Sequence, residues 1–301
     1  MKVAIIGCGA VGLYFASKLC NRHTVELIGR AHTRVEAFNT HGFYVNGKHI
    51  NNCRFVVASE NVCKCDLLIL ALKITGQALD IHCLRAIDNL IHEGTTILPL
   101  MNGVTFYDEL RSRYASRVIG GAVNIIVRMG EQFNHVEQCG ITPHLTYGTL
   151  SAFKAHDLLR IRSLFHLGIE LTESSQMMTK LWEKFVFITS LAALGCQCQE
   201  SLRTVVRCDV KIETLRYLNE EGCAVANAVL GDSAIHPSSI TARQVAIFGS
   251  MDDSIATVSA QRDEMEGKAS ELRFLVGSMV EYASRYNIDV PVMSAHMPNV
   301  I

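Results

Sequence analysis

A short apolar stretch followed by three glycines at the start of the chain constrains its fold more than any other feature. Val3–Ile6 is an apolar run typical of a buried parallel strand, and Gly7, Gly9 and Gly12 follow it in the pattern G-x-G-x-x-G. In such a pattern the first glycine permits a tight turn, the second lets a pyrophosphate approach bare backbone, and the third lets the next helix pack against the strand.

The helix expected over residues 11–19 would offer free N–H groups and a positive dipole end to phosphates. A glycine-rich turn without a ligand is the alternative, but a strand before the glycines and an amphipathic helix after them favour a dinucleotide-binding domain. The residues expected to bind the cofactor are Gly7, Cys8, Gly9, Ala10, Val11 and Gly12.

The end of the second expected strand, at residues 24–28, indicates which dinucleotide is bound. Sites that prefer NAD usually carry Asp or Glu here, and this chain has Gly29 followed by Arg30. A guanidinium binds a 2′-phosphate bidentately, and Arg34 and His32 are near in sequence. We therefore expect NADP(H). The alternative is that these arginines are solvated loop charges.

The chain has 301 residues, which is long enough for two domains, and 49% of them are apolar, which is enough for a hydrophobic core in each. Its formal net charge is −1. The basic residues are scattered and not interleaved with aromatic residues, so we expect no nucleic-acid partner. No apolar run reaches the length of a membrane span, and the glycines near the N-terminus argue against a secretory signal.

Eleven cysteines are dispersed through apparent core segments, which favours free thiols in a reducing cytoplasm. Two closely spaced pairs, Cys63-x-Cys65 and Cys196-x-Cys198, lack the spacing and the Cys/His partners of a zinc site, so no metal is expected.

Alternating strand and helix patterns in the first half predict an α/β fold, a Rossmann-type doubly wound parallel sheet. The expected strands are 3–6, 25–28, 67–72, 96–98 and 118–126, and the expected helices are 11–19, 34–40, 77–90 and 106–113. A hairpin is expected from 43–45 and 49–55 around Asn46-Gly47, with further edge strands within 133–147.

The pattern becomes helical after about residue 174, with helices expected over 177–194, 210–230, 238–248 and 264–286. We therefore predict a nucleotide-binding domain over residues 1–173 and an all-helical substrate domain over 174–301.

Polar residues that follow two strands of the first domain are candidates for the site. Lys73 follows the run 67–72, and Asn102-Gly103 follows the run 96–101. Ligands bind beyond the carboxyl ends of strands in open α/β sheets, which places both positions near the cofactor. The alternatives are a solvated charge for Lys73 and a plain turn for Asn102-Gly103.

Lys184 is the most unusual residue of the helical half, because the stretch 181–194 around it is otherwise nearly all apolar. Desolvation makes an ammonium a better acid, which suits protonation of a ketone oxygen. Ile188 and Ala192 share its helix face. The alternative is a lysine that snorkels to solvent. Glu271 could pair with Lys184 or accept a substrate hydroxyl, and the alternative for it is a solvated helix face. Ser259 is a candidate for binding a carboxylate.

These motifs together resemble the ketopantoate reductase family (2-dehydropantoate 2-reductases) over nearly the whole chain. The matching features are the glycine pattern, Arg30, Leu72-Lys73, Asn102-Gly103-Val104, Trp182-x-Lys184-Phe185, and Ser259 with Ser270-Glu271-Leu272. The resemblance implies a Rossmann domain plus a helical domain related to 6-phosphogluconate dehydrogenase. It also implies NADPH-dependent reduction of 2-oxopantoate to (R)-pantoate, a step towards pantothenate and coenzyme A.

By the same resemblance, Lys184 and Glu271 are the catalytic residues, Lys73 and Asn102 belong to the cofactor site, and Ser259 binds substrate. Asn102, Lys184, Ile188 and Ala192 complete the expected substrate site. The family typically has asparagines four and eight residues after the lysine, where this chain has Ile188 and Ala192. Without these amides the expected substrate pocket is more apolar. Each hydrogen bond to substrate that is lost in this way costs about 1–3 kcal/mol.

The sequence thus predicts an NADP-dependent oxidoreductase acting on a small-molecule 2-oxo acid, nominally ketopantoate, in the cytoplasm. The sequence is also compatible with a homodimer. Two alternatives stay open: a reductase respecialised for a more apolar 2-oxo acid, and a non-catalytic protein that binds NADP(H) as a sensor.

Overall fold

The computed structural model of the protein describes residues 1–58, 62–76, 79–150, 158–162 and 168–298. By contacts between residues the chain divides into two compact units. The first consists of Met1–Leu72, Leu79–Met101 and Tyr107–Met177, and the second of Lys73–Ala78, Asn102–Phe106 and Met178–Ile301. The short segments with Lys73 and Asn102 therefore group with the second unit. The expected linear division after residue 173 puts them in the first domain, and it stays a prediction.

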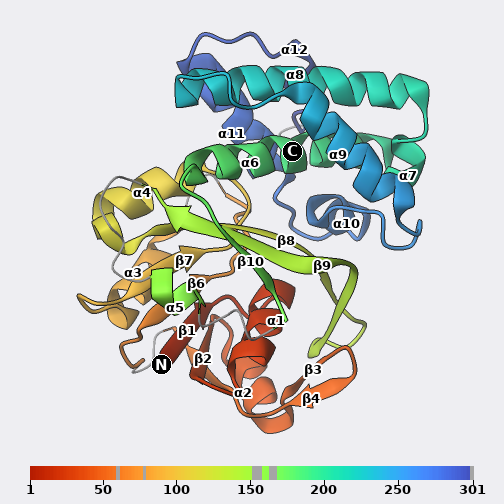
Figure 1. Ribbon diagram of the computed structural model, residues 1–301. Coiled ribbons are helices and arrows are strands. Elements are labelled where there is room, and N and C mark those ends of the chain that lie inside the picture. Colours follow the sequence, from red (N-terminus) through yellow and green to blue (C-terminus); the bar gives the residue numbers. More distant parts are fainter. Residues whose placement is uncertain (59–61, 77–78, 151–157, 163–167, 299–301) are drawn as a thin grey trace. The chain divides into compact units, whose positions relative to one another are not determined.

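A five-stranded parallel sheet forms the centre of the first unit. Its strands are β1 (Lys2–Ile6), β2 (Thr24–Gly29), β5 (Arg54–Val57), β6 (Leu67–Leu70) and β7 (Thr96–Pro99). They lie in the order β5-β2-β1-β6-β7, so the chain builds one side of β1 first and then crosses over to the other side. Strands β1, β2, β6 and β7 are labelled in Figure 1. The helices of this unit are α1 (Ala10–Leu19), α2 (His32–His41), α3 (Ile81–Leu90), α5 (Leu158–Arg162), the 3₁₀ turn η1 (Ala115–Arg117) and, from Tyr107 on, α4 (Thr105–Tyr114). The predicted α/β fold with a Rossmann-type sheet is confirmed.

A second sheet completes the first unit. It contains β3 (Phe43–Val45), β4 (Lys48–Ile50), β8 (Ile119–Met129), β9 (His135–Thr149) and β10 (Glu170–Glu173). The order is β10-β9-β3-β4, and β8 pairs antiparallel with β9. Asn46 and Gly47 join β3 to β4 with positive φ angles of 49° and 77°, as a tight hairpin turn requires.

Three strand predictions need correction. The expected strand 49–55 is two strands, because β4 ends at Ile50 and β5 joins β2 at the edge of the parallel sheet. The expected strand 118–126 is β8, which pairs with β9 in the second sheet. The region 133–147 is the long strand β9 of that sheet and adds nothing to the edge of the parallel sheet. Apolar runs predict strands, but they do not identify the sheet to which each strand belongs.

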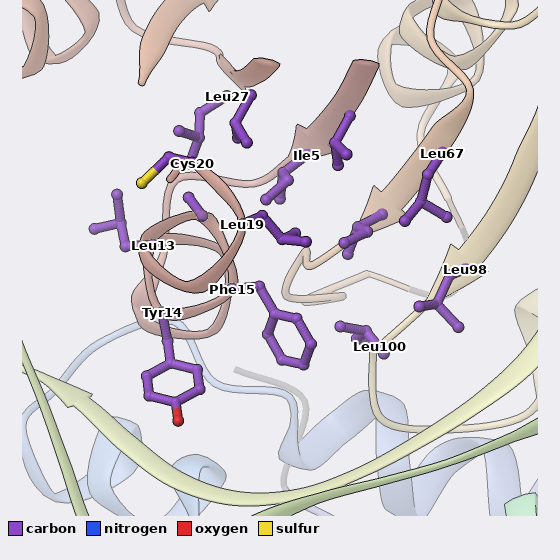
Figure 2. Close-up of a cluster of buried hydrophobic side chains, with 14 of the residues drawn as sticks. Ile5, Leu13, Tyr14, Phe15, Leu19, Cys20, Leu27, Leu67, Leu98 and Leu100 are labelled. Atoms are coloured by element: carbon purple, nitrogen blue, oxygen red, sulfur yellow. The ribbon is translucent and has the colours of Figure 1, made fainter. Parts of the chain in front are cut away.

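Helix α1 packs between the two sheets of the first unit. In Figure 2, Phe15 and Leu19 of α1 lie towards Ile5 of β1 and Leu98 of β7. The same buried cluster includes Leu145 and Tyr147 of β9, along with Val123 and Val127 of β8. Fully burying a leucine side chain contributes about 1.5–3 kcal/mol, so α1 is held on both sides by the hydrophobic effect.

The second unit is helical in its described residues. Its helices are α6 (Met177–Cys198), α7 (Leu202–Val205), α8 (Asp209–Leu230), α9 (Pro237–Ser250), α10 (Ser259–Met265), α11 (Leu272–Arg285) and α12 (Pro291–Ala295). Trp182 of α6 is 1% exposed and packs edge-on against Phe185, with ring centroids 5.5 Å apart. The second half is therefore helical, as predicted.

A buried polar network joins three of these helices. The side-chain amide of Asn219 on α8 donates to Thr241 and Gln244 of α9, at 2.9 and 2.7 Å. Gln244 Nε2 in turn donates to Ser190 Oγ of α6 at 2.8 Å and to the Phe187 carbonyl at 3.0 Å. Because unpaired polar groups are costly in a core, this network fixes how α6, α8 and α9 pack.

The helix expected over 264–286 is wrong, because the chain is not helical between Glu266 and Glu271. Gly267 has a φ of +64° and ends α10. Its N–H donates to the Glu264 carbonyl, and the Lys268 N–H donates to the Asp263 carbonyl at 2.7 Å. This pair of bonds is a Schellman motif, which ends a helix at a left-handed glycine. The break gives Glu271 a position just before α11.

Candidate active site

The three glycines of the first loop have different environments. Gly7 has a φ of +118°, and a Cβ there would lie 2.3 Å from the Ala71 carbonyl oxygen. A Cβ on Gly12 would lie 1.9 Å from the Gly7 carbonyl oxygen, so α1 starts in direct contact with the loop. A Cβ on Gly9 would meet no atom within 4 Å. Gly7 and Gly12 are therefore required by the fold, and Gly9 leaves open space next to bare backbone.

The N-terminus of α1 presents backbone N–H groups that make no intrahelical hydrogen bond. Gly9 precedes the helix and supplies no side-chain cap. The first intrahelical bond runs from Leu13 N to the Gly9 carbonyl, so the N–H groups of Ala10, Val11 and Gly12 come before it. Such N–H groups at the positive end of a helix bind phosphate, and the space beside Gly9 lets it approach.

Cys8 lies within this loop but turns towards β2. A Cβ placed on Gly29 would come within 3.4 Å of the Cys8 sulfur. Burial raises the pKa of the Cys8 thiol to about 12, and the charge of Arg34 opposes the shift. Cys8 is therefore a neutral thiol at physiological pH and a poor nucleophile.

Two exposed arginines follow β2. The Arg30 side chain is 82% exposed, and its nearest acidic group is Asp80 Oδ2 at 3.7 Å. Arg34 is exposed and lies over the Phe38 ring, with 5.6 Å between the guanidinium carbon and the ring centroid. A long, exposed ion pair contributes little, so Arg30 is available to an incoming anion.

Glu271 is the centre of the polar cluster in the second unit. It is 3% exposed, and burial raises the pKa of its carboxyl. Its Oε1 accepts the Ile74 N–H at 3.1 Å, and its Oε2 accepts the Asn102 side-chain amide at 3.3 Å. These bonds, together with the charges of Lys73 and Lys184, oppose the rise in pKa. The cluster thus brings together four of the predicted site residues, Lys73, Asn102, Lys184 and Glu271.

Lys184 lies in the first half of α6 and is partly buried. Desolvation lowers the pKa of its ammonium to about 8, and the charge of Glu271 opposes that shift. Among the described residues, no hydrogen bond or salt bridge engages the Lys184 ammonium. A lysine with a pKa near neutrality can both release and regain a proton under physiological conditions.

Asp263 belongs to the same cluster, and the sequence reasoning missed it. Lys73 Nζ lies 2.7 Å from Asp263 Oδ1 and 2.6 Å from Oδ2. The Asp263 side chain is 9% exposed and that of Lys73 is 52% exposed. The stretch Arg262-Asp-Glu-Met-Glu266 carries three acidic residues, and only burial distinguishes Asp263 from its neighbours. The end of α10 at Gly267 was the available signal that this segment is not one long helix.

The other residues predicted to bind substrate, Ile188, Ala192 and Ser259, are buried or partly buried. Ala192 is 1% exposed, and Ile188 is partly buried on the same face of α6 as Lys184. Ser259 is the first residue of α10 and is partly buried. Gly103 has a φ of +101°, and a Cβ there would lie 2.7 Å from the Phe274 ring, which explains the glycine after Asn102.

All eleven cysteines are free thiols. Within the described ranges, no group of three or more His, Cys, Asp or Glu residues could hold a metal ion. None of the described helices has the length and apolar character that a membrane span requires.

A Rossmann-type unit with a glycine-rich loop before α1 and a helical unit with a buried cluster of lysine and carboxylate side chains are typical of two-unit oxidoreductases that use a nucleotide cofactor. The chain belongs to the ketopantoate reductase family. The family model described as Ketopantoate reductase PanE/ApbA matches residues 3–151, and the model of its C-terminal part matches residues 176–298. These matches confirm the resemblance inferred from the motifs.

Several proteins resemble the chain over almost its full length. The 2-dehydropantoate 2-reductase of Pyrococcus abyssi is 24% identical, with 97% of this chain and 94% of the relative covered. The structure of 2-dehydropantoate 2-reductase from Geobacter metallireducens has a TM-score of 0.87 at 23% identity, covering 98% and 97% of the two chains. A structure of D-mandelate dehydrogenase with NADH and anilino(oxo)acetate also has a TM-score of 0.87, at 19% identity and with coverage of 98% and 96%. At these identities the two structures show a shared fold.

Proposed function

We propose that the protein is an NADP(H)-dependent reductase that converts a 2-oxo acid to the 2-hydroxy acid. The nominal substrate is 2-dehydropantoate, which would become (R)-pantoate on the route to pantothenate and coenzyme A in the cytoplasm. The observation that carries the proposal is the lowered pKa of Lys184, about 8, in a cluster with Glu271, Asn102 and Lys73.

The residues of the glycine loop suit the binding of the cofactor. The N–H groups of Ala10, Val11 and Gly12 would bind the pyrophosphate, and Arg30 would bind the 2′-phosphate that distinguishes NADP(H) from NAD(H). The nicotinamide ring, when bound, supplies or accepts the hydride. Arg34 is exposed in the first turn of α2 and can add to the positive charge.

Lys184 is proposed to give its proton to the ketone oxygen as the carbon is reduced. A group with a pKa of about 8 is mostly protonated at pH 7, yet it is a stronger acid than a solvated lysine. Glu271, fixed by Ile74 and Asn102, supports the ammonium electrostatically and so keeps the pKa of Lys184 from falling further. Asn102 and Ser259 are proposed to hold the substrate.

A second candidate function is the reduction of a more apolar 2-oxo acid. Ile188 and Ala192 favour it, because both place aliphatic groups on the helix face of Lys184. A third, a protein that holds NADP(H) without turnover, is disfavoured by the retention of Lys184 and Glu271 with their shifted pKa values.

The test is the loss of NADPH absorbance with ketopantoate and with a panel of aliphatic and aromatic 2-oxo acids, repeated with NADH. We expect turnover that Lys184→Ala reduces by at least a hundredfold and Lys180→Ala, on the same helix, leaves nearly unchanged. Arg30→Ala should raise the KM for NADPH and leave that for NADH unaltered. Tight NADPH binding without turnover on any 2-oxo acid would instead support the binding protein.

A further inference from the structure

Two cysteines from different elements of the first unit meet at the C-terminal end of α1. Cys20 follows the helix, and its N–H donates to the Ala16 carbonyl at 2.9 Å. The Cys53 thiol, in the connection between β4 and β5, is directed at the same carbonyl at 4.0 Å. Asn52 Nδ2 donates to the Cys20 carbonyl at 3.1 Å and so holds this connection against the helix end.

The two thiols also interact with each other. The Cys20 thiol donates to the Ser17 carbonyl at 3.6 Å. Interaction with the Cys53 side chain lowers the pKa of Cys20 against the opposing effect of burial, and Asn52 and Lys48 add to the lowering. The same interaction raises the pKa of Cys53. Cys20 thus carries the more stable thiolate, and Cys53 keeps its proton beside it. A thiolate next to a second thiol is the arrangement of reversible redox cysteines.

Other cysteines of this unit differ from this pair. Burial raises the pKa of Cys65 and that of Cys83 to about 12, and no second cysteine contributes to either shift. The proximity of Cys20 and Cys53 is therefore a specific feature of the end of α1.

We propose that Cys20 and Cys53 form a reversible thiol–disulfide site that is oxidised by hydrogen peroxide. The Cys20 thiolate attacks a peroxide oxygen, the O–O bond breaks, and Cys20 becomes a sulfenic acid while the leaving hydroxide takes up a proton as water. As the Cys53 sulfur attacks the Cys20 sulfur, the proton of the Cys53 thiol passes to the departing hydroxide, an S–S bond forms, and the S–O bond breaks to release a second water. Two thiols are oxidised and one peroxide is reduced.

Access to the site suits a small oxidant. Cys20 is 7% exposed and Cys53 is partly exposed, so hydrogen peroxide, which is close to water in size, can reach a sulfur that a larger disulfide reagent would reach slowly. Lys48 is exposed and close enough to affect Cys20, and its positive charge favours the thiolate there. The new bond would tie the end of α1 to the chain just before β5.

The sequence around the two cysteines allows a direct test. Trypsin cleaves after Lys18 and Arg22 and after Lys48 and Arg54, which leaves Cys20 and Cys53 in separate short peptides with no other cysteine. The full-length protein is treated with hydrogen peroxide at pH 7, alkylated and digested without reduction. We expect the two peptides joined, at a mass two hydrogens below their sum, and separated again by dithiothreitol.

Matched variants separate the site from general oxidation. Cys20→Ser should abolish the joined peptide, and Cys53→Ser should abolish it and leave a Cys20 sulfenic acid that dimedone labels. Cys63→Ser, at an exposed cysteine, should not change its yield. Oxidation of Cys63 without any Cys20–Cys53 link, or dimedone labelling of Cys20 in the wild-type protein that never resolves, would overturn the proposal.

Discussion

Asn102 donates its side-chain amide to Glu271 Oε2 at 3.3 Å, although the two residues are 169 positions apart in the chain. Glu271 also accepts the N–H of Ile74, which follows Lys73 directly. Segments after two strands of the parallel sheet thus contribute to one cluster with the start of α11. The carboxylate is buried, and these donors compensate for part of its lost hydration.

Replacing Glu271 by Gln should shift the pH dependence of the reaction. The charge of Glu271 raises the pKa of Lys184 against desolvation, so its removal should bring that pKa below about 8. Because the protonated lysine is the proposed acid, the fall of kcat/KM at alkaline pH should begin at a lower pH in Glu271→Gln. The measurement is a pH profile of ketone reduction between pH 6 and about 10. Glu281→Gln, at an exposed position on α11, is the control. An unshifted profile would contradict the assignment.

Lys184→Met should make the protein more stable at pH 7. A lysine with a pKa of about 8 in the folded state and 10.5 in the unfolded state binds fewer protons when folded in the window between these values. The free energy of unfolding of the wild-type protein therefore increases with pH in that window. At pH 7 the lysine is charged in both states, and the buried charge makes the folded protein less stable. We expect Lys184→Met to gain roughly 1–3 kcal/mol at pH 7 and less at pH 10.

Chemical denaturation of both proteins at the two pH values measures this difference. Lys180→Met is the matched control, because Lys180 lies on the same helix and pairs with Glu183; its effect should stay within about 0.5 kcal/mol. Equal stability of wild type and Lys184→Met at pH 7 would show that burial of the ammonium is not costly.

Alanine substitutions at Gly9 and Gly12 should separate ligand binding from folding. A Cβ at Gly9 meets no protein atom within 4 Å, so Gly9→Ala should melt within a degree or two of wild type and bind NADPH at least tenfold more weakly. A Cβ at Gly12 would meet the Gly7 carbonyl oxygen at 1.9 Å, so Gly12→Ala should lower the melting temperature by several degrees. Thermal unfolding and NADPH titration measure both effects, and equal melting temperatures for the two variants would refute the distinction.

Asparagine at positions 188 and 192 should increase activity on ketopantoate. Each amide adds polar groups to the helix face of Lys184, and one hydrogen bond to a substrate oxygen contributes about 1–3 kcal/mol, or roughly a tenfold to hundredfold gain in kcat/KM. Ile188→Leu changes shape without adding polarity and is the control for Ile188→Asn. An unchanged preference between ketopantoate and apolar 2-oxo acids in the double variant would mean that these positions do not set specificity.

The sequence predicted local elements well where one signal dominated. Local sequence determines the structure of Val3–Ile6 with its glycines and of the apolar stretch around Lys184. The first is a strand and the second a helix, as expected. The pairing of β8 and β9 in a second sheet could not be inferred, because strand patterns carry no information on partners. The break after α10 was predictable from Gly267, but the apolar periodicity on either side of it suggested one continuous helix.

The contacts among the candidate site residues could not be predicted from the sequence. The ion pair between Lys73 and Asp263 joins positions 190 residues apart, one just after the end of β6 and the other within α10. Charge alone could not select Asp263 over Glu264 and Glu266, because burial made the difference. The lowered pKa of Lys184 was inferred from its apolar surroundings, and desolvation is indeed its main cause.

The position of α1 between two sheets has a consequence for ligand affinity. Since its side chains are packed on both sides, the helix cannot rotate or fray at its first turn without disturbing the core of the unit. The N–H groups ahead of Leu13 therefore keep one orientation before any phosphate arrives. A ligand there would lose its own freedom but would not have to order the protein, and this preorganisation strengthens binding without adding a single contact.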